Sequence, residues 1–392
     1  MFKMDFLQPS KYELVIIAIG VANLLAIIFL FKQLGLSVLQ SDPYMYLLQS
    51  KQWWVKDLHL PGYAIIIWSI NLLTFNLLPE ILLLHLVSAL TWVASLFSFI
   101  TVMKILDIEQ KNRIVLLILY AFFPLIGLTF AAWPIADSAV YLLINILVIA
   151  CLKKNWILLT VALSFGLLVH KFVWGFCLLI ALYAYFSLGF PLSLIFVAGL
   201  PLLIFLTWIA FQGEGAFWIL QHDLERHFTS YSQFPIFDGI IGTILSSGAQ
   251  NIFKGCLLLL IFTAELVLFI KAWLSRQWFA IAIIFPLLLL GLIVNQWLAI
   301  AILRFAKIAI LAVVLLIASK NLKISSYLTN PKVIFLMLII LIGSQYSYAI
   351  YMERFFREGG TLDYKLQLES DVMKKKGLPT YDRGVENLTV KP

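Results

Sequence analysis

A few ionisable side chains stand at the edges of long apolar runs of this sequence, where they are candidates for chemistry. An acid in such a place suits a general base, and cations near it suit a phosphate. A pocket lined by both would fit a substrate that carries a hydroxyl to deprotonate and a phosphate to hold. The residues of this set are Asp42, Asp57, His59, Asp137, His170, Lys171 and Arg304.

The rest of the chain is strongly apolar. Of its 392 residues, 62% are hydrophobic and 12% are charged, whereas a typical soluble domain has about 25% charged residues. The composition therefore predicts an all-α polytopic membrane protein, and the run Leu14 to Phe31 is interpreted as a retained helix rather than a signal peptide. The net charge of +8 indicates loops attracted to anionic lipid headgroups and not to nucleic acid.

The apolar runs predict about eleven membrane-spanning helices. Lys and Arg concentrate in four connections, 104–113, 153–154, 271–276 and 320–332, which the positive-inside rule places together in the cytoplasm. That assignment requires segment 61–77 not to cross the bilayer, so we predict a re-entrant or surface-lying helix there. The predicted spans are 14–33, 80–103, 114–131, 138–152, 156–169, 172–188, 191–211, 252–270, 278–294, 298–318 and 332–351.

The same orientation brings the candidate residues to the extracytoplasmic side of the membrane. Two outer loops are long, the first covering 34–79 and the other about 212–251. Arg304 is expected about two turns inside a span, roughly 9 Å deep at 1.5 Å per residue. Because a buried arginine is costly unless it is paired or faces a cavity, we expect a polar site at that depth.

Four motifs follow one another along the first half of the chain: Asp42 with Tyr44, then 59–63 (His-Leu-Pro-Gly-Tyr), then 133–137 (Trp-Pro-Ile-Ala-Asp), then His170-Lys171. Their order resembles the GT-C glycosyltransferases, and in particular the polyprenyl-phosphate-sugar-dependent branch with the protein mannosyltransferase-like and PIG-V-like families. The resemblance covers about residues 10–190. It implies a GT-C-like helix bundle whose long first outer loop contains a membrane-surface helix.

The resemblance also implies a reaction, the inverting transfer of a sugar from a polyprenyl-phosphate donor to an acceptor hydroxyl on the extracytoplasmic side. The acceptor would be a lipid, a glycan of the cell envelope or a protein, and no cofactor or nucleic acid is expected. The family's first acid is often one of a pair, whereas Pro43 follows Asp42 here, so no metal site is expected either. The implied catalytic base is Asp42, and the implied substrate-binding residues are Tyr44, His59, Asp137, His170, Lys171 and Arg304.

We expect one transmembrane catalytic domain, residues 1–351, followed by a short polar tail, residues 352–392. A bacterial-type cell membrane is favoured over the endoplasmic reticulum. Two other functions remain open. A polysaccharide polymerase or ligase that uses lipid-linked glycans would be expected to carry arginine-rich outer loops, and a secondary transporter would be expected to show inverted repeats.

Each candidate residue also has a purely structural interpretation. Asp42 and Asp137 both stand where a helix N-cap is expected. Lys171 fits a lysine whose ammonium reaches the lipid headgroups from a helix end. Arg304, with Lys307 three residues later, fits a helix that simply has a polar face.

Overall fold

The computed structural model describes residues 8–33, 42–51, 60–123, 131–209, 238–245, 249–294 and 300–358. At residues 42, 44, 45, 209, 238, 249–253, 300 and 351–358 it describes the backbone and not the side chain. These ranges contain helices and loops without a strand, so the predicted all-helical class is confirmed for them.

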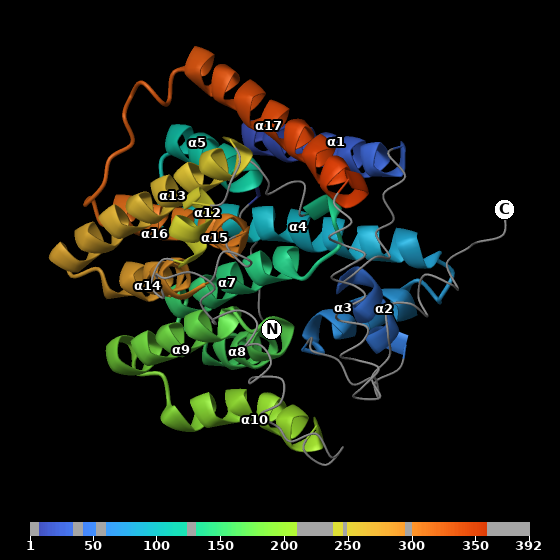
Figure 1. Ribbon diagram of the computed structural model, residues 1–392. Coiled ribbons are helices and arrows are strands. Elements are labelled where there is room, and N and C mark those ends of the chain that lie inside the picture. The colour runs from blue at the N-terminus through green and yellow to red at the C-terminus, as the bar shows by residue number, and fades with distance from the viewer. Residues whose placement is uncertain are drawn as a thin grey trace.

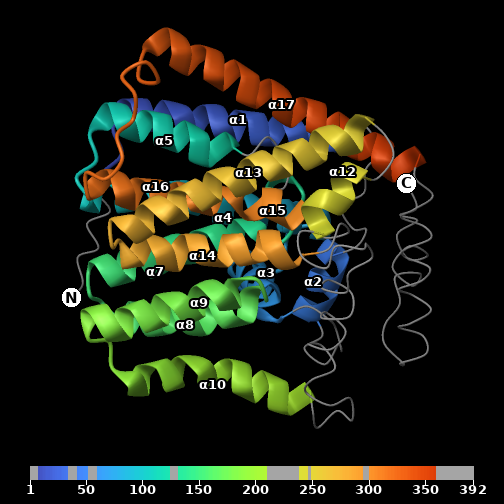
Figure 2. The same ribbon diagram turned by 60° about the vertical axis from the view of Figure 1, so that its left-hand side comes forward.

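The helices lie side by side, most of them with nearly parallel axes, and α10 and α17 form opposite flanks of the bundle (Figures 1 and 2). Each predicted span overlaps one of them. The elements are α1 (Lys11–Gln33), α2 (Asp42–Lys51), α3 (Gly62–Leu73), α4 (Glu80–Ile105), α5 (Gln110–Phe122), α7 (Asp137–Leu152), α8 (Trp156–Val169), α9 (Val173–Tyr183), the π-helix η1 (Ala184–Leu188), α10 (Leu192–Ile209), the π-helix η3 (Asp238–Gly242), α12 (Thr243–Leu245), α13 (Ala249–Leu274), α14 (Trp278–Ile293), α15 (Ile300–Phe305), the 3-10 turn η4 (Ala306–Ile308), α16 (Ala309–Ala318) and α17 (Pro331–Glu358).

Five helical segments are long and apolar enough to cross a membrane, and they indicate a membrane protein. They are Lys11–Gln33, Glu80–Ile105, Lys254–Leu274, Ala301–Ala318 and Pro331–Ile350. Six further apolar helices are shorter, at 10–17 residues. The count of about eleven spans therefore stays a prediction.

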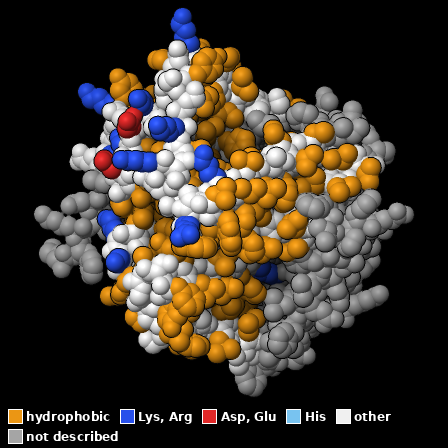
Figure 3. All heavy atoms as spheres, turned by 90° about the vertical axis from the view of Figure 1, so that its left-hand side faces the viewer, with side chains coloured by type: hydrophobic (Ala, Val, Ile, Leu, Met, Phe, Trp, Pro, Cys, Tyr) orange, Lys and Arg blue, Asp and Glu red, His pale blue; other side chains and the backbone are white. Residues whose placement is uncertain are grey.

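Exposed Lys and Arg side chains gather over one end of the bundle (Figure 3). Connections that are far apart in the sequence meet there, because α4–α5, α7–α8, α13–α14 and α16–α17 all turn at the same end (Figure 2). This common end is what the positive-inside prediction requires, and its cytoplasmic orientation stays a prediction. Its exposed cations include Lys111, Lys153, Lys154, Lys271, Arg276, Lys320, Lys323 and Lys332.

The buried carboxylate of Glu13 connects α1 to this basic end through ion pairs. Glu13 has no exposed surface and accepts hydrogen bonds from Arg113 Nε at 2.7 Å and from the Ser10 backbone N–H at 2.6 Å. Lys104 lies 3.9 Å from the same carboxylate. Glu13 is therefore an ion-paired buried acid whose partners come from the α4–α5 hairpin.

Helix α3, inside the segment predicted not to cross, has 12 residues, about 18 Å of length against about 30 Å of hydrocarbon. Its first turn is packed, because a Cβ at Gly62 would lie only 2.7 Å from the Leu168 carbonyl oxygen. Its far end exposes apolar side chains, including Leu73 and Phe75. A short helix with one anchored end and one apolar exposed end fits a surface-lying or re-entrant segment.

Two predicted spans differ from the observed helices. The span predicted at 298–318 is interrupted by η4, and its described part begins with α15 at Ile300, four residues before Arg304. The span predicted at 114–131 is helical as α5 only to Phe122, after which Phe123 has an extended backbone. Hydropathy averaged over a whole span does not locate either break. The sequence has local signals at both, since Arg304 and Lys307 lie at the first break and Pro124, which favours an extended backbone at the residue before it, follows Phe123.

Candidate functional site

An ion pair between α7 and α15 forms the centre of the candidate site. Arg304 Nε donates to Asp137 Oδ2 at 2.7 Å, and Nη2 donates to Oδ1 at 2.5 Å. The Asp137 side chain is fully buried and that of Arg304 is 13% exposed. The N-cap of α7 is Ala136, and no side chain caps that end. The capping interpretation of Asp137 is therefore wrong, since its carboxylate is used to hold a guanidinium.

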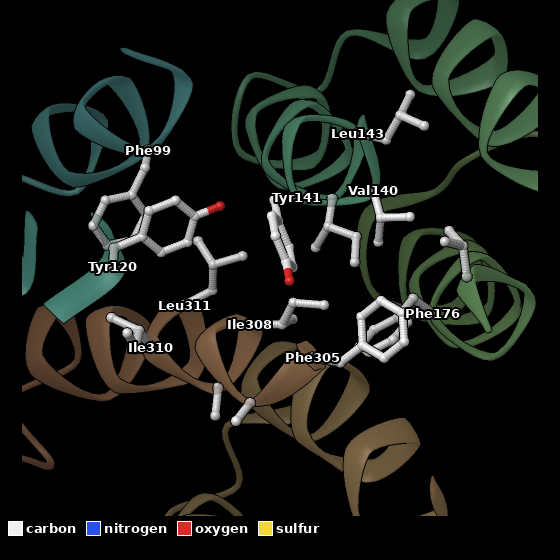
Figure 4. Close-up of a cluster of buried hydrophobic side chains, with 14 of the residues drawn as sticks. Phe99, Tyr120, Val140, Tyr141, Leu143, Phe176, Phe305, Ile308, Ile310 and Leu311 are labelled. Atoms are coloured by element: carbon white, nitrogen blue, oxygen red, sulfur yellow. The ribbon is translucent and has the colours of Figure 1, made fainter. Parts of the chain in front are cut away.

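Tyr141 and Lys307 extend this pair into the bundle. The Tyr141 hydroxyl donates a hydrogen bond to the backbone carbonyl of Arg304. Lys307 Nζ lies 3.8 Å from the centroid of the Tyr141 ring and 5.0 Å from that of Tyr120, so both rings present their faces to the ammonium. Figure 4 shows the Tyr141 hydroxyl directed toward the helix that carries Phe305 and Ile308.

Lys307 is completely buried, and no hydrogen-bond partner of its Nζ is found in the part of the chain that the structure describes. The polar helix face formed by Arg304 and Lys307 is therefore directed into the protein and not toward solvent. With Lys307 protonated, the charges of Asp137, Arg304 and Lys307 would sum to +1. Because a buried ammonium without a counter-ion is costly, an anion bound beside Lys307 would stabilise its charged form. A buried excess cation suits an anionic ligand.

The helix that carries the two cations is broken between them. α15 ends at Phe305, and Lys307 lies in η4 before α16 begins. A side chain that bonds to a backbone carbonyl is one cause of such interruptions, and the bond from Tyr141 to the Arg304 carbonyl stands where the geometry changes. Short 3-10 stretches inside longer helices often mark functional positions.

His170 and Lys171 lie at the end of α8, beside the same cluster. The His170 ring is 5.7 Å from the ring of Phe305, the residue after Arg304, and 5.2 Å from that of Phe172. Its Nδ1 accepts a hydrogen bond from the Phe172 backbone N–H at 3.3 Å. Lys171 is half-buried. The structure thus gathers His170, Asp137 and Arg304, which are far apart in the sequence.

The first outer loop is attached to this region through two tyrosines. Tyr63 is fully buried, and its ring meets that of Tyr46 edge-on at 4.9 Å. Gly62, the residue before Tyr63, lies against Leu168 and Val169 at the end of α8. Tyr46 is one helical turn after Asp42, the first residue of α2. The predicted roles of the Asp42 and Tyr44 side chains, and of His59 and Asp57, lie outside the described residues.

No site role was expected from the sequence for three residues of this cluster, although Tyr63 was noted within the 59–63 motif and Lys307 beside Arg304. The third is Tyr141. Tyr141 follows Asp137 by four positions, the spacing that puts two side chains on one helix face. Lys307 lies in an apolar run three residues after Arg304, and this position also indicates a second basic side chain directed into the protein.

Within the described ranges no group of three or more His, Cys, Asp or Glu side chains is arranged to hold a metal ion. Comparison of the chain with protein-family models, with curated proteins and with solved structures found no match in any of the three.

Proposed function

We propose that this protein is an integral-membrane inverting glycosyltransferase, which moves a sugar from a polyprenyl-phosphate donor to an acceptor hydroxyl on the extracytoplasmic side. The observation that carries the proposal is the polar cluster of Asp137, Arg304 and Lys307, buried where α7 meets a broken helix. The motif order of the first half of the chain supplies the reaction type.

The role proposed for Arg304 is to bind the donor phosphate. A guanidinium has five N–H donors, and Asp137 engages two of them, so orientation by Asp137 and contact with a phosphate are compatible. Lys307 supplies the excess charge that an anionic phosphodiester would balance. A pair of unit charges about 4 Å apart is worth roughly 4 kcal/mol at an effective dielectric of 20, and the leaving phosphate gains charge in the transition state.

The role proposed for Asp42 is general base. It would remove the proton of the acceptor hydroxyl as the oxygen attacks the anomeric carbon, and the polyprenyl phosphate would leave from the opposite face with inversion. General bases of this kind contribute about 10²–10⁴-fold. The Tyr46–Tyr63 contact supports this role, because it holds α2 beside α3, whose first turn packs against the end of α8 that precedes His170.

Sugar transfer in reconstituted vesicles tests the proposal. The purified protein is given a panel of labelled polyprenyl-phosphate sugars with crude acceptor lipid. Wild type is compared with Asp42→Asn and Arg304→Lys, and with the matched control Glu109→Gln, whose exposed carboxylate pairs with Lys111 at the basic end. The proposal expects transfer by wild type and by the control, and its loss in both site variants when they are folded.

Two results would count against it. Full activity of folded Asp42→Asn would remove the assigned base. If no donor were consumed by folded wild type, the polymerase or ligase and the secondary transporter would become the leading functions, and lipid-linked oligosaccharides and solute uptake would be assayed next.

A further inference from the structure

A second buried acid lies outside the cluster described above. Glu265 stands near the middle of the membrane-spanning part of α13, Lys254–Leu274. It is 2% exposed, and both of its carboxyl oxygens are buried without a hydrogen-bond partner in the structure as described. An acid at this depth is rare in membrane helices and marks a functional position by default.

The elements packed against α13 offer this carboxyl no described cation. α14 and α16 contain no ionisable residue. The Thr243 hydroxyl of α12 donates to the Gly239 carbonyl. Arg304 of α15 is held by Asp137, and Lys307 of η4 lies between the rings of Tyr120 and Tyr141. Asp238 of η3 is itself an acid whose side chain is not described.

The cations of α13 itself stand toward the two ends of the span. Lys254 is eleven residues before Glu265 and the exposed Lys271 is six residues after it, which are axial separations of about 16 Å and 9 Å at 1.5 Å per residue. Neither lies within one helical turn of the carboxyl. An ionised Glu265 would therefore be a buried charge without a counter-ion, which is far more costly than a buried neutral acid.

We propose that Glu265 is a proton-binding site within the bilayer, which carries its proton when α13 is packed as described here. The carboxylate takes up one proton on burial and releases it when the packing around α13 opens to water or to a cation. The ligand of this site is the proton alone, and the inference does not depend on the sugar-transfer reaction.

Glu13 provides an internal comparison. It is the same residue type and is equally buried, but Arg113 and the Ser10 backbone N–H bind its carboxylate. Its paired environment stabilises the ionised form, whereas that of Glu265 stabilises the protonated form. The two residues should therefore differ in every measurement that distinguishes an acid from its anion.

Labelling with dicyclohexylcarbodiimide in native membranes at neutral pH tests this difference. The acid gives its proton to a carbodiimide nitrogen while its oxygen adds to the central carbon, so the hydrophobic reagent modifies protonated carboxyls in apolar surroundings. Peptide mapping by mass spectrometry should find the adduct on Glu265 and not on Glu13, and Glu265→Gln should lose it. An adduct on Glu13 with none on Glu265 would overturn the proposal.

Infrared difference spectroscopy covers the case in which the reagent cannot reach a protonated Glu265. The spectrum of wild type minus Glu265→Gln at neutral pH should contain the carbonyl band of a protonated carboxyl, and the band should shift in D₂O. Carboxylate bands in its place would overturn the proposal whatever the labelling shows. If Glu265→Gln does not fold, carbodiimide mapping on wild type at rising pH decides, because labelling of a proton site must fall as the acid ionises.

Discussion

Asp137 and Arg304 are 167 positions apart in the chain, yet they form a two-point ion pair at the start of α7. The pair joins two helices at the point where one of them is about to break. Its neighbours Tyr141 and Lys307 depend on the same junction, because Tyr141 binds the Arg304 carbonyl and covers the Lys307 ammonium. These contacts lead to separate expectations for each residue.

Asp137→Asn should destabilise the protein strongly. Removal of one partner of a buried ion pair leaves the other charge uncompensated, at a cost of about 3–5 kcal/mol. Thermal unfolding in detergent should show a clear drop in Tm. Replacing both partners with apolar residues, Asp137→Leu with Arg304→Met, should recover much of that loss but no activity. Equal Tm values for wild type and Asp137→Asn would show that the pair is not formed.

Tyr141→Phe should weaken the junction while keeping the ring that lies over Lys307. The lost hydroxyl leaves the Arg304 carbonyl without that donor, and an unsatisfied buried group costs about 1–3 kcal/mol. Tyr141→Leu should cost more, since it also removes the cation–π contact. The matched control is Tyr327→Phe, whose ring is exposed in the α16–α17 connection. A control that loses as much stability as Tyr141→Phe would contradict this assignment.

Lys307→Met should separate stability from anion binding. Removing a buried ammonium that has no described hydrogen-bond partner relieves a desolvation cost, so Tm should stay equal or rise. Binding of a polyprenyl phosphate and the rate of sugar transfer should both fall, because the excess positive charge is gone. Lys320→Met, at an exposed position of the basic end, should change neither. Unaltered phosphate affinity in Lys307→Met would remove this lysine from the site.

Gly62→Ala should disturb the first outer loop by a steric route. The new Cβ would lie 2.7 Å from the Leu168 carbonyl oxygen and 2.8 Å from Val169 Cγ2, so α3 must move away from the end of α8. Overpacking of this kind costs about 1–3 kcal/mol. At Gly199 of α10 a Cβ meets nothing within 4 Å, and alanine there should stabilise the helix by roughly 0.5–1 kcal/mol. Limited proteolysis near α3 and thermal unfolding would compare the two variants, and similar behaviour would argue against the close approach.

Several features were readable before the structure. Mean hydropathy and the spacing of polar breaks predicted spans that each overlap an observed helix, because burial in lipid selects apolar residues locally, one helix at a time. The sparse polar residues at the breaks pointed to Asp137, His170 and Arg304, which the structure brings together. Helix boundaries were less accurate, as the interruption at η4 and the end of α5 at Phe122 show.

The amino-acid sequence by itself determined the membrane class, the helical composition and the common side of the basic connections, since hydrophobicity and charge act through the immediate neighbours of each residue. Tertiary structure alone decided which charges meet. It paired Arg304 with Asp137, placed Lys307 between two tyrosine rings and left Glu265 without a described partner while Glu13 gained an arginine. Each of these outcomes depends on how separate helices pack. Packing brings together residues that are far apart in the chain, and local sequence patterns do not indicate which of them will meet.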